Sequence, residues 1–145
     1  VVVDSRYQLM RFRGVTAVTP NESEAEKAVR LKLIDEQELE RAAHLLLERL
    51  KLQAVLITRG NRGMSLLEKN SPIVHIPISG SDDITDVTGA GDTVATVFTL
   101  ALAAGAGFYD AAFLANCAAG VVVMKRGTAV LSREELREAM RRHYE

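Results

Sequence analysis

The sequence lacks the residues that would build a disulfide scaffold, a zinc site or a basic surface. Its 145 residues include one cysteine, no tryptophan and three histidines. The single thiol of Cys117 cannot form an internal disulfide, and neither it nor any histidine has a partner at metal-ligand spacing. We interpret Cys117 as a small buried residue. The formal net charge of −1 argues against nucleic-acid binding.

Long hydrophobic runs are also missing. The longest apolar stretches, residues 94–107 and 111–124, are shorter than the roughly 20 residues that span a bilayer. The chain begins with Val-Val-Val-Asp and shows no charged segment typical of a signal peptide, so we expect a cytoplasmic protein without a membrane partner. Because this β-branched start is typical of a strand, we also expect a fragment of a longer protein.

Apolar residues make up 48% of the chain and charged residues 26%, as in an ordinary globular domain. Strand-like and helix-like segments alternate, which predicts one α/β domain over residues 1–145 with a mainly parallel sheet. The expected strands cover residues 1–4, 15–19, 54–58, 64–68 and 73–77. The expected helices begin near Asn21 and Ser132 or cover residues 35–50, 92–104 and 109–124. Ser132 and Glu135 have the spacing of a capping box for the last of these helices. The helix over 92–104 is almost entirely small or apolar, so we expect it to be buried on most sides.

One glycine-rich segment is suited to binding an anion. Residues 86–92 read Asp-Val-Thr-Gly-Ala-Gly-Asp and lead directly into an expected helix. Glycine lets the backbone approach a ligand closely, and the N–H groups and dipole at a helix start favour negative charge. Such donors would stabilise a phosphoryl group in transfer, and Asp92 could accept a proton from an attacking hydroxyl. The alternative is a tight turn with Asp92 as an ordinary helix-start acid.

Three other segments allow both a structural and a functional interpretation. Asn21 and Glu24 have the spacing of a helix capping box. Residues 58–63, Thr-Arg-Gly-Asn-Arg-Gly, can be a turn at a strand end. Asn116, a polar residue within an apolar helix, can be a core side chain bonded to the backbone. The residues alone leave these alternatives open.

The segment Asp-Val-Thr-Gly-Ala-Gly-Asp-Thr resembles the second signature of ribokinase-like (PfkB) carbohydrate kinases. The resemblance implies that Asp92 is the catalytic base and that the amides of Gly89, Ala90 and Gly91 form an anion hole. It also implies a three-layer α/β ribokinase-like fold, of which this chain would be the C-terminal half. ATP and Mg²⁺ would be the cofactors, and a small sugar or sugar phosphate would be the acceptor.

Other residues match the family pattern in the same order along the chain. Asn21 and Glu24 resemble an Asn-x-x-Glu motif that helps place phosphate and magnesium, with Glu24 acting through water. The resemblance assigns to the nucleotide Thr58, Gly60 and Gly63 beside its phosphates, Asn116 in the adenine pocket, and Gly127 in the loop that closes the purine site. Asp86 and Thr88 match a region that can hold a monovalent cation such as K⁺.

The chain also departs from the family pattern in several places. The family's first signature, its N-terminal sheet and its sugar-contacting lid have no counterpart here, so the fragment by itself should be inactive. The family's dimers often use that lid, which makes a homodimer of the full-length protein a further expectation. Thr96 and Val97 stand where the family usually has small residues, and their β-branched side chains can alter the packing of the catalytic helix.

Within the family, the resemblance is strongest to bacterial heptose-7-phosphate kinases, including the kinase half of a bifunctional kinase/adenylyltransferase. Residues 63–67, 86–94 and 118–123 carry it, and it implies conversion of heptose 7-phosphate to heptose 1,7-bisphosphate. Two alternatives stay open: a kinase for another sugar or a nucleoside, and a nucleotide-binding module without catalysis. A dinucleotide-dependent oxidoreductase is disfavoured, because the first strand lacks the Gly-x-Gly-x-x-Gly turn.

Overall fold

The computed structural model describes residues 1–79, 89–125 and 129–144. The described residues divide into two units that are treated separately below. Unit 1 comprises residues 1–59 and 64–75, and unit 2 comprises residues 60–63 together with the described residues from Ile76 onward.

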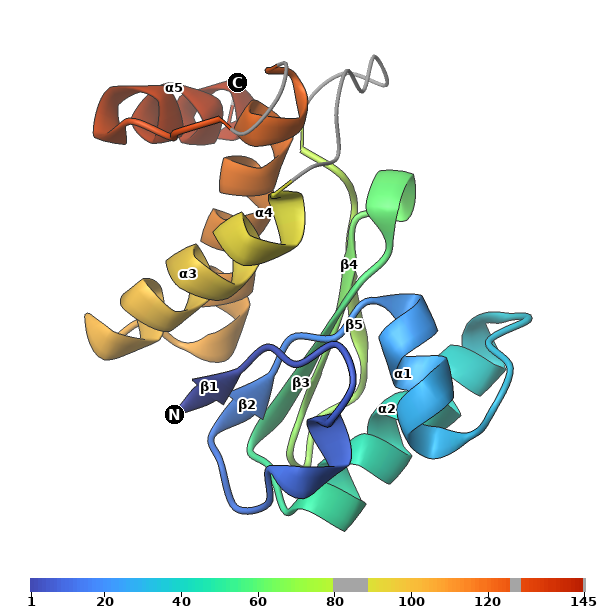
Figure 1. Cartoon of the computed structure of the whole chain (residues 1–145). Coiled ribbons are helices and arrows are strands. Elements are labelled where there is room, and N and C mark those ends of the chain that lie inside the picture. Colours follow the sequence, from blue (N-terminus) through green and yellow to red (C-terminus); the bar gives the residue numbers. More distant parts are fainter. Residues whose placement is uncertain (80–88, 126–128, 145) are drawn as a thin grey trace. The chain divides into compact units, whose positions relative to one another are not determined.

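A sheet with strands in the order β1-β2-β3-β4-β5 forms the frame of unit 1 (Figure 1). Its strands are β1 (Val2–Val3), β2 (Ala17–Val18), β3 (Ala54–Thr58), β4 (Met64–Glu68) and β5 (Val74–Ile76), whose last residue belongs to unit 2. β1, β2 and β3 are parallel, with Ala17 opposite Ala54, and β4 returns antiparallel to β3, with Met64 opposite Thr58. The predicted α/β class with a mainly parallel sheet is therefore confirmed.

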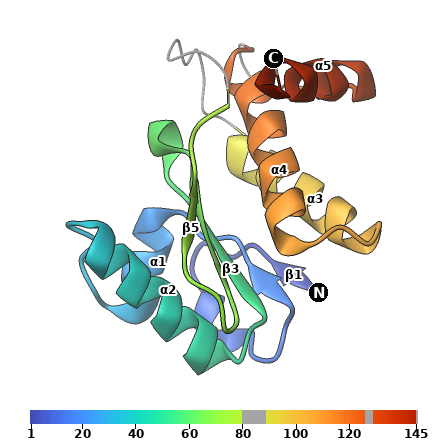
Figure 2. The same ribbon diagram turned by 180° about the vertical axis from the view of Figure 1, so that it is seen from behind.

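Two helices and a short 3-10 turn pack on one face of this sheet, as Figure 1 and Figure 2 both show. They are η1 (Leu9–Arg11), α1 (Glu22–Val29) and α2 (Glu36–Leu50). The apolar stripe of α2 is buried at spacings of three and four and consists of Leu39, Ala42, Ala43, Leu46, Leu47 and Leu50. It packs against strand residues such as Val55 and Ile57. Burying each of its leucine side chains contributes roughly 1.5–3 kcal/mol, so this stripe anchors the unit.

Unit 2 is mainly helical and contains η2 (Gly60–Arg62), α3 (Ala90–Ala103), α4 (Phe108–Val123) and α5 (Arg133–Tyr144). The rings of Phe98 and Phe108 lie 6.5 Å apart where α3 packs on α4. At the start of α5, Ser132 and Glu135 exchange backbone-to-side-chain hydrogen bonds of 2.8 and 3.2 Å. The capping box predicted for this helix is therefore confirmed.

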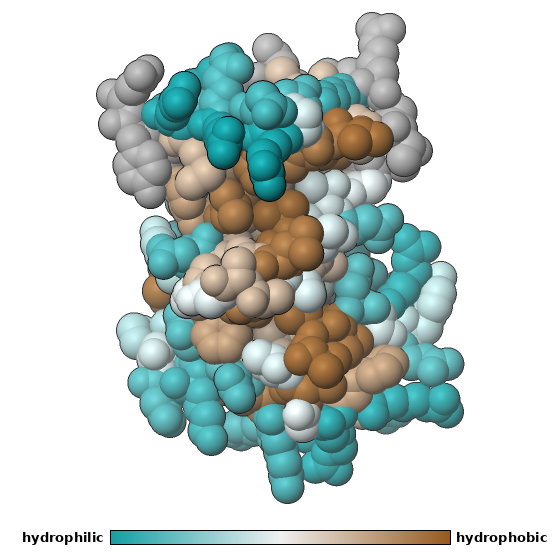
Figure 3. Space-filling view, turned by 90° about the vertical axis from the view of Figure 1, so that its left-hand side faces the viewer, coloured by the Kyte–Doolittle hydropathy of each residue, from teal (hydrophilic) through white to brown (hydrophobic). Residues whose placement is uncertain are grey.

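The prediction that the glycine-rich segment leads into a helix buried on most sides is wrong for α3. Its buried side chains form one stripe of Val94, Phe98 and Ala101, whereas Leu100 is 64% exposed. Figure 3 shows a hydrophilic surface over α5 and a largely apolar surface over α3. The sequence could not indicate which side of α3 meets solvent, because a helix of small and apolar residues has no polar face.

The described helices are all too short or too polar to cross a bilayer.

Candidate active site

The predicted anion hole forms the first turn of α3 in unit 2. Gly89 is the N-cap residue, in the left-handed conformation with φ 80° and ψ 0°, and its carbonyl accepts hydrogen bonds of 3.0 Å from both the backbone N–H and the hydroxyl of Thr93. Because glycine has no side chain, it gives no side-chain cap to the amides of Ala90, Gly91 and Asp92. Apart from the adjoining backbone, no atom of the described residues lies within 4 Å of where a Cβ would stand at Gly89 or Gly91. Among the described residues these amides have no hydrogen-bond acceptor, so they are suited to receiving an anion.

Asp92 is exposed and lines a cavity of about 390 Å³ between α3 and the start of α5. Thr96 and Val97, the two departures from the family pattern, line it as well, so they bear on the space beside the proposed base. Sequence reasoning missed Arg133, which brings a cation to the same cavity. No sequence motif indicated Arg133 as a site residue, because it lies 41 positions from Asp92 in an ordinary charged helix.

In unit 1 the structure brings together Asn21, Glu24 and Thr58. Asn21 Oδ1 accepts the Glu24 N–H at 2.9 Å, and Glu24 Oε2 accepts the Asn21 N–H at 3.0 Å, so the capping box is confirmed. Asn21 also forms an isolated parallel bridge with Thr58, whose N–H donates to the Pro20 carbonyl at 3.0 Å. The magnesium role of Glu24 and the nucleotide role of Thr58 stay predictions.

Replacing Asn21 with alanine should lower the free energy of unfolding by about 1 kcal/mol, because the N–H of Glu24 loses its side-chain acceptor. Serine at the same position should keep most of the stability, since it is also a good N-cap residue. Urea unfolding followed by circular dichroism measures this. Ser23→Ala, on the exposed side of α1, is the control and should change little. Equal losses in Asn21→Ala and Asn21→Ser would contradict the capping explanation.

An ion-pair network that the sequence did not predict surrounds the buried side chain of Arg59. Its side chain is 5% exposed and donates to Glu22 at 3.0 Å and to both carboxylate oxygens of Glu36 at 2.5 and 3.0 Å. Burial alone would lower the pKa of Arg59, but hydrogen bonds to Glu36 and then Glu22 outweigh burial and raise it. Ser65 Oγ lies 3.4 Å from the guanidinium and 2.8 Å from His75 Nδ1. The network anchors the chain between Thr58 and Gly60.

Gly60 and Gly63 both have positive φ, 58° and 76°, and the N–H of Gly63 donates to the Gly60 carbonyl at 3.1 Å. A Cβ at Gly60 would meet nothing within 4 Å, whereas one at Gly63 would collide with the backbone of residues 76–78. Gly63 is therefore required by close packing, which is independent of its predicted role beside the nucleotide phosphates. The open space beside Gly60 fits that role, which stays a prediction.

Asn116, Cys117 and Gly120 of α4 hold the segment that follows β5. Asn116 Nδ2 donates to the Pro77 carbonyl at 2.6 Å and is 2% exposed, as expected of a core asparagine. The Ser79 hydroxyl donates to Cys117 Sγ at 3.7 Å, and the Ser79 carbonyl lies against the Cα of Gly120. The adenine-pocket role of Asn116 stays a prediction.

Three other predicted site residues, Asp86, Thr88 and Gly127, lie outside the described residues.

The thiol of Cys117 should react slowly with Ellman's reagent in the native protein. It is fully buried, and burial raises its pKa, so both access and the thiolate fraction are reduced. We expect a rate at least about tenfold below that of the urea-unfolded chain, because the reagent can reach the thiol only when the native structure opens. Absorbance at the thionitrobenzoate band measures the reaction, and a native rate equal to the unfolded rate would contradict this burial.

Comparison with known families defines the class to which this fold and site belong. The model for the pfkB family carbohydrate kinases matches residues 2–135. The chain therefore belongs to the pfkB family of carbohydrate kinases, as its signature predicted.

Two bifunctional HldE proteins are similar to most of this chain. The bifunctional protein HldE of Methylococcus capsulatus is 51% identical over 126 residues, which cover 87% of this chain and 26% of that protein. HldE of Syntrophotalea carbinolica is 42% identical over 144 residues, or 99% of this chain and 29% of that protein. The chain thus spans less than a third of the length of these relatives.

Solved structures confirm the ribokinase-like fold. Phosphofructokinase-2 from Escherichia coli in complex with potassium superposes with a TM-score of 0.88 at 19% identity, covering 99% of this chain and 47% of that one. Arabidopsis thaliana ribokinase complexed with ribose and ATP gives a TM-score of 0.85 at 19% identity, covering 96% and 46%. Thermotoga maritima ribokinase gives 0.77 at 27% identity, covering 90% and 43%.

Proposed function

We propose that the full-length protein transfers the γ-phosphoryl group of ATP to a hydroxyl of a sugar or sugar phosphate, and that this chain supplies the catalytic base. The observation that carries the proposal is the start of α3, where uncapped amides and the exposed Asp92 carboxylate come from one turn. Membership of the pfkB family and the ribose and ATP bound to Arabidopsis ribokinase support it.

The transfer needs one base and one set of donors. The acceptor hydroxyl loses its proton to Asp92 as its oxygen bonds to the γ-phosphorus, and the bond from that phosphorus to the ADP oxygen breaks. The amides of Gly89, Ala90 and Gly91 stabilise the charge on the phosphoryl oxygens. The proton ends on Asp92, and the products are the phosphorylated sugar and ADP.

Magnesium would neutralise the nucleotide phosphates when bound. Glu24 fits an outer position toward it, because Oε2 is engaged with the Asn21 N–H while Oε1 has no hydrogen bond among the described residues and can accept one from a metal-bound water. Asp86 and Thr88 are the proposed ligands of a monovalent cation, which the potassium complex of E. coli phosphofructokinase-2 supports.

We further propose heptose 7-phosphate as the acceptor and heptose 1,7-bisphosphate as the product. The similarity to bifunctional HldE proteins at 42% to 51% identity supports this choice. A kinase for another sugar or a nucleoside is the alternative, because the residues that carry the resemblance are ones expected to serve the scaffold and the nucleotide rather than the sugar. A homodimer of the full-length protein is proposed from the family pattern alone. The relative described as a tetrameric inhibited form is phosphofructokinase-2 of E. coli.

The test is ADP release by the full-length protein with ATP, Mg²⁺ and one acceptor at a time. We expect turnover with heptose 7-phosphate and much slower turnover with ribose or fructose 6-phosphate. Phosphorus NMR of the product should show a new phosphate on the anomeric oxygen. Faster turnover with one of the other acceptors would replace the heptose assignment. ATP binding without ADP release for any acceptor would favour the non-catalytic nucleotide-binding module.

A further inference from the structure

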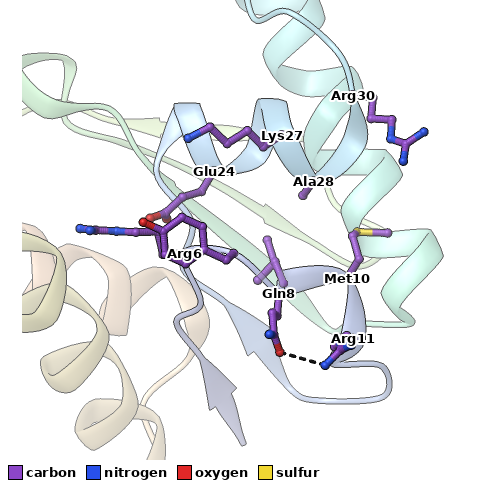
Figure 4. Close-up of a pocket in the computed structure, with 10 residues that line it drawn as sticks. Arg6, Gln8, Met10, Arg11, Glu24, Lys27, Ala28 and Arg30 are labelled. Carbon is purple, nitrogen blue, oxygen red and sulfur yellow. Dashed lines mark hydrogen bonds between the residues drawn. The ribbon is translucent and has the colours of Figure 1, made fainter.

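Unit 1 contains a cavity whose lining shares only Glu24 with the residues proposed for the phosphoryl transfer. It has a volume of about 450 Å³ and lies between the segment from Arg6 to Arg11 and helix α1. Its charged lining residues are four bases and one acid, namely Arg6, Arg11, Lys27, Arg30 and Glu24. In Figure 4, Arg6, Glu24 and Lys27 extend toward one side of this basic cleft, and Arg11 lies on the other side beside Gln8.

Carboxylates of the described residues do not neutralise the basic groups of the cleft through ion pairs. Elsewhere in the chain, bases such as Lys32 and Lys125 contact carboxylates at 3.1 and 2.6 Å. Within the described ranges, Arg6, Lys27 and Arg30 form no ion pair. Arg11 donates at 3.1 Å to the neutral side-chain oxygen of Gln8. In a chain of net charge −1, this concentration of unpaired positive charge around one cavity favours an anionic ligand.

The acid in the lining does not cancel this charge. One carboxylate oxygen of Glu24 already accepts the Asn21 N–H at 3.0 Å, which engages part of its negative charge at the start of α1. The pKa of Glu26 is lowered chiefly by hydrogen bonds from the Leu33 N–H and Lys32. Lys27 contributes to this lowering only as a more distant charge. The ammonium group of Lys27 therefore remains available to a ligand.

We propose that the basic cleft binds the phosphate group of a small phosphorylated metabolite, with Arg6 and Lys27 as its main charged contacts. Guanidinium and ammonium groups are the side chains that recognise phosphate by charge-assisted hydrogen bonds. The volume lies in the range of pockets that hold small metabolites. This binding goes beyond the proposed catalysis and can be measured without turnover, so either proposal can fail while the other stands.

Hydrogen–deuterium exchange of the full-length protein, read by mass spectrometry, tests the proposal. Inorganic phosphate and fructose 6-phosphate are the two probes, with sodium chloride at matched ionic strength as the reference and no ATP present. We expect both probes to protect peptides covering residues 5–11 and 24–30. The double variant Arg6→Gln/Lys27→Gln should weaken binding at least about tenfold, because it removes two charge-assisted contacts. Both side chains are exposed, so the variant should fold.

Arg41→Gln is the matched control, since Arg41 is an exposed base on α2 outside the cleft. It should bind both probes as the parent protein does. Stronger protection by fructose 6-phosphate than by inorganic phosphate would identify a sugar phosphate as the ligand class. The proposal would be overturned if neither probe protected these peptides, or if the double variant were protected as strongly as the parent protein.

Discussion

Replacing Asp92 with asparagine in the full-length protein should lower kcat by about 10²–10⁴-fold, the usual contribution of a general base. The amide cannot take the proton of the attacking hydroxyl at neutral pH. The affinity for ATP should change by less than about threefold, because the base is needed in the transition state rather than for nucleotide binding. Steady-state ADP release gives kcat, and calorimetric titration with ATP and Mg²⁺ gives the affinity.

Asp110 offers a matched control for this experiment. It is also an exposed aspartate in the first turn of an apolar helix, α4, but it lies away from the glycine-rich segment. Asp110→Asn should leave kcat and ATP affinity unchanged. Near-normal turnover in Asp92→Asn would remove Asp92 from the role of base. Loss of ATP affinity together with turnover would instead indicate that the carboxylate helps to bind the nucleotide.

Local sequence patterns predicted the elements whose residues carry their own signals. The leucine spacing of α2 placed that helix to within one residue, with Asp35 as its N-cap, and the apolar run of β3 was placed without error. The capping boxes at Asn21 and Ser132 were predicted from spacing alone. These features depend on residues close in the chain, whose chemistry suffices to define them.

Features that depend on distant residues could not be predicted in this way. The network around Arg59 joins side chains up to 37 positions away, and no local pattern marks those partners. The exposure of Leu100 likewise depends on which face of α3 meets α4. In the candidate site, the glycine-rich motif identified Asp92, whereas the cavity beside it and its neighbour Arg133 required the fold.

The second large effect is expected at Gly63. Replacing it with alanine should lower the free energy of unfolding by about 2–4 kcal/mol. A left-handed backbone costs a non-glycine residue roughly 1 kcal/mol, and overpacking against neighbouring atoms adds about 1–3 kcal/mol. The added Cβ would stand 2.7 Å from both the Ile78 nitrogen and the Pro77 carbonyl carbon, and still closer to the Ile76 carbonyl oxygen. These are backbone atoms, so no side-chain rotation can relieve the collision.

Gly60→Ala separates the two contributions. Gly60 has a similar φ, 58° against 76°, yet its Cβ would meet nothing within 4 Å. The free energy of unfolding of Gly60→Ala should therefore fall only by the conformational contribution, about 1 kcal/mol. Urea unfolding of both variants measures the difference, which is the cost of the collision. Equal losses would mean that the backbone of residues 76–78 moves aside. A large loss of ATP affinity in a stable Gly60→Ala protein would then assign the open space beside Gly60 to the nucleotide.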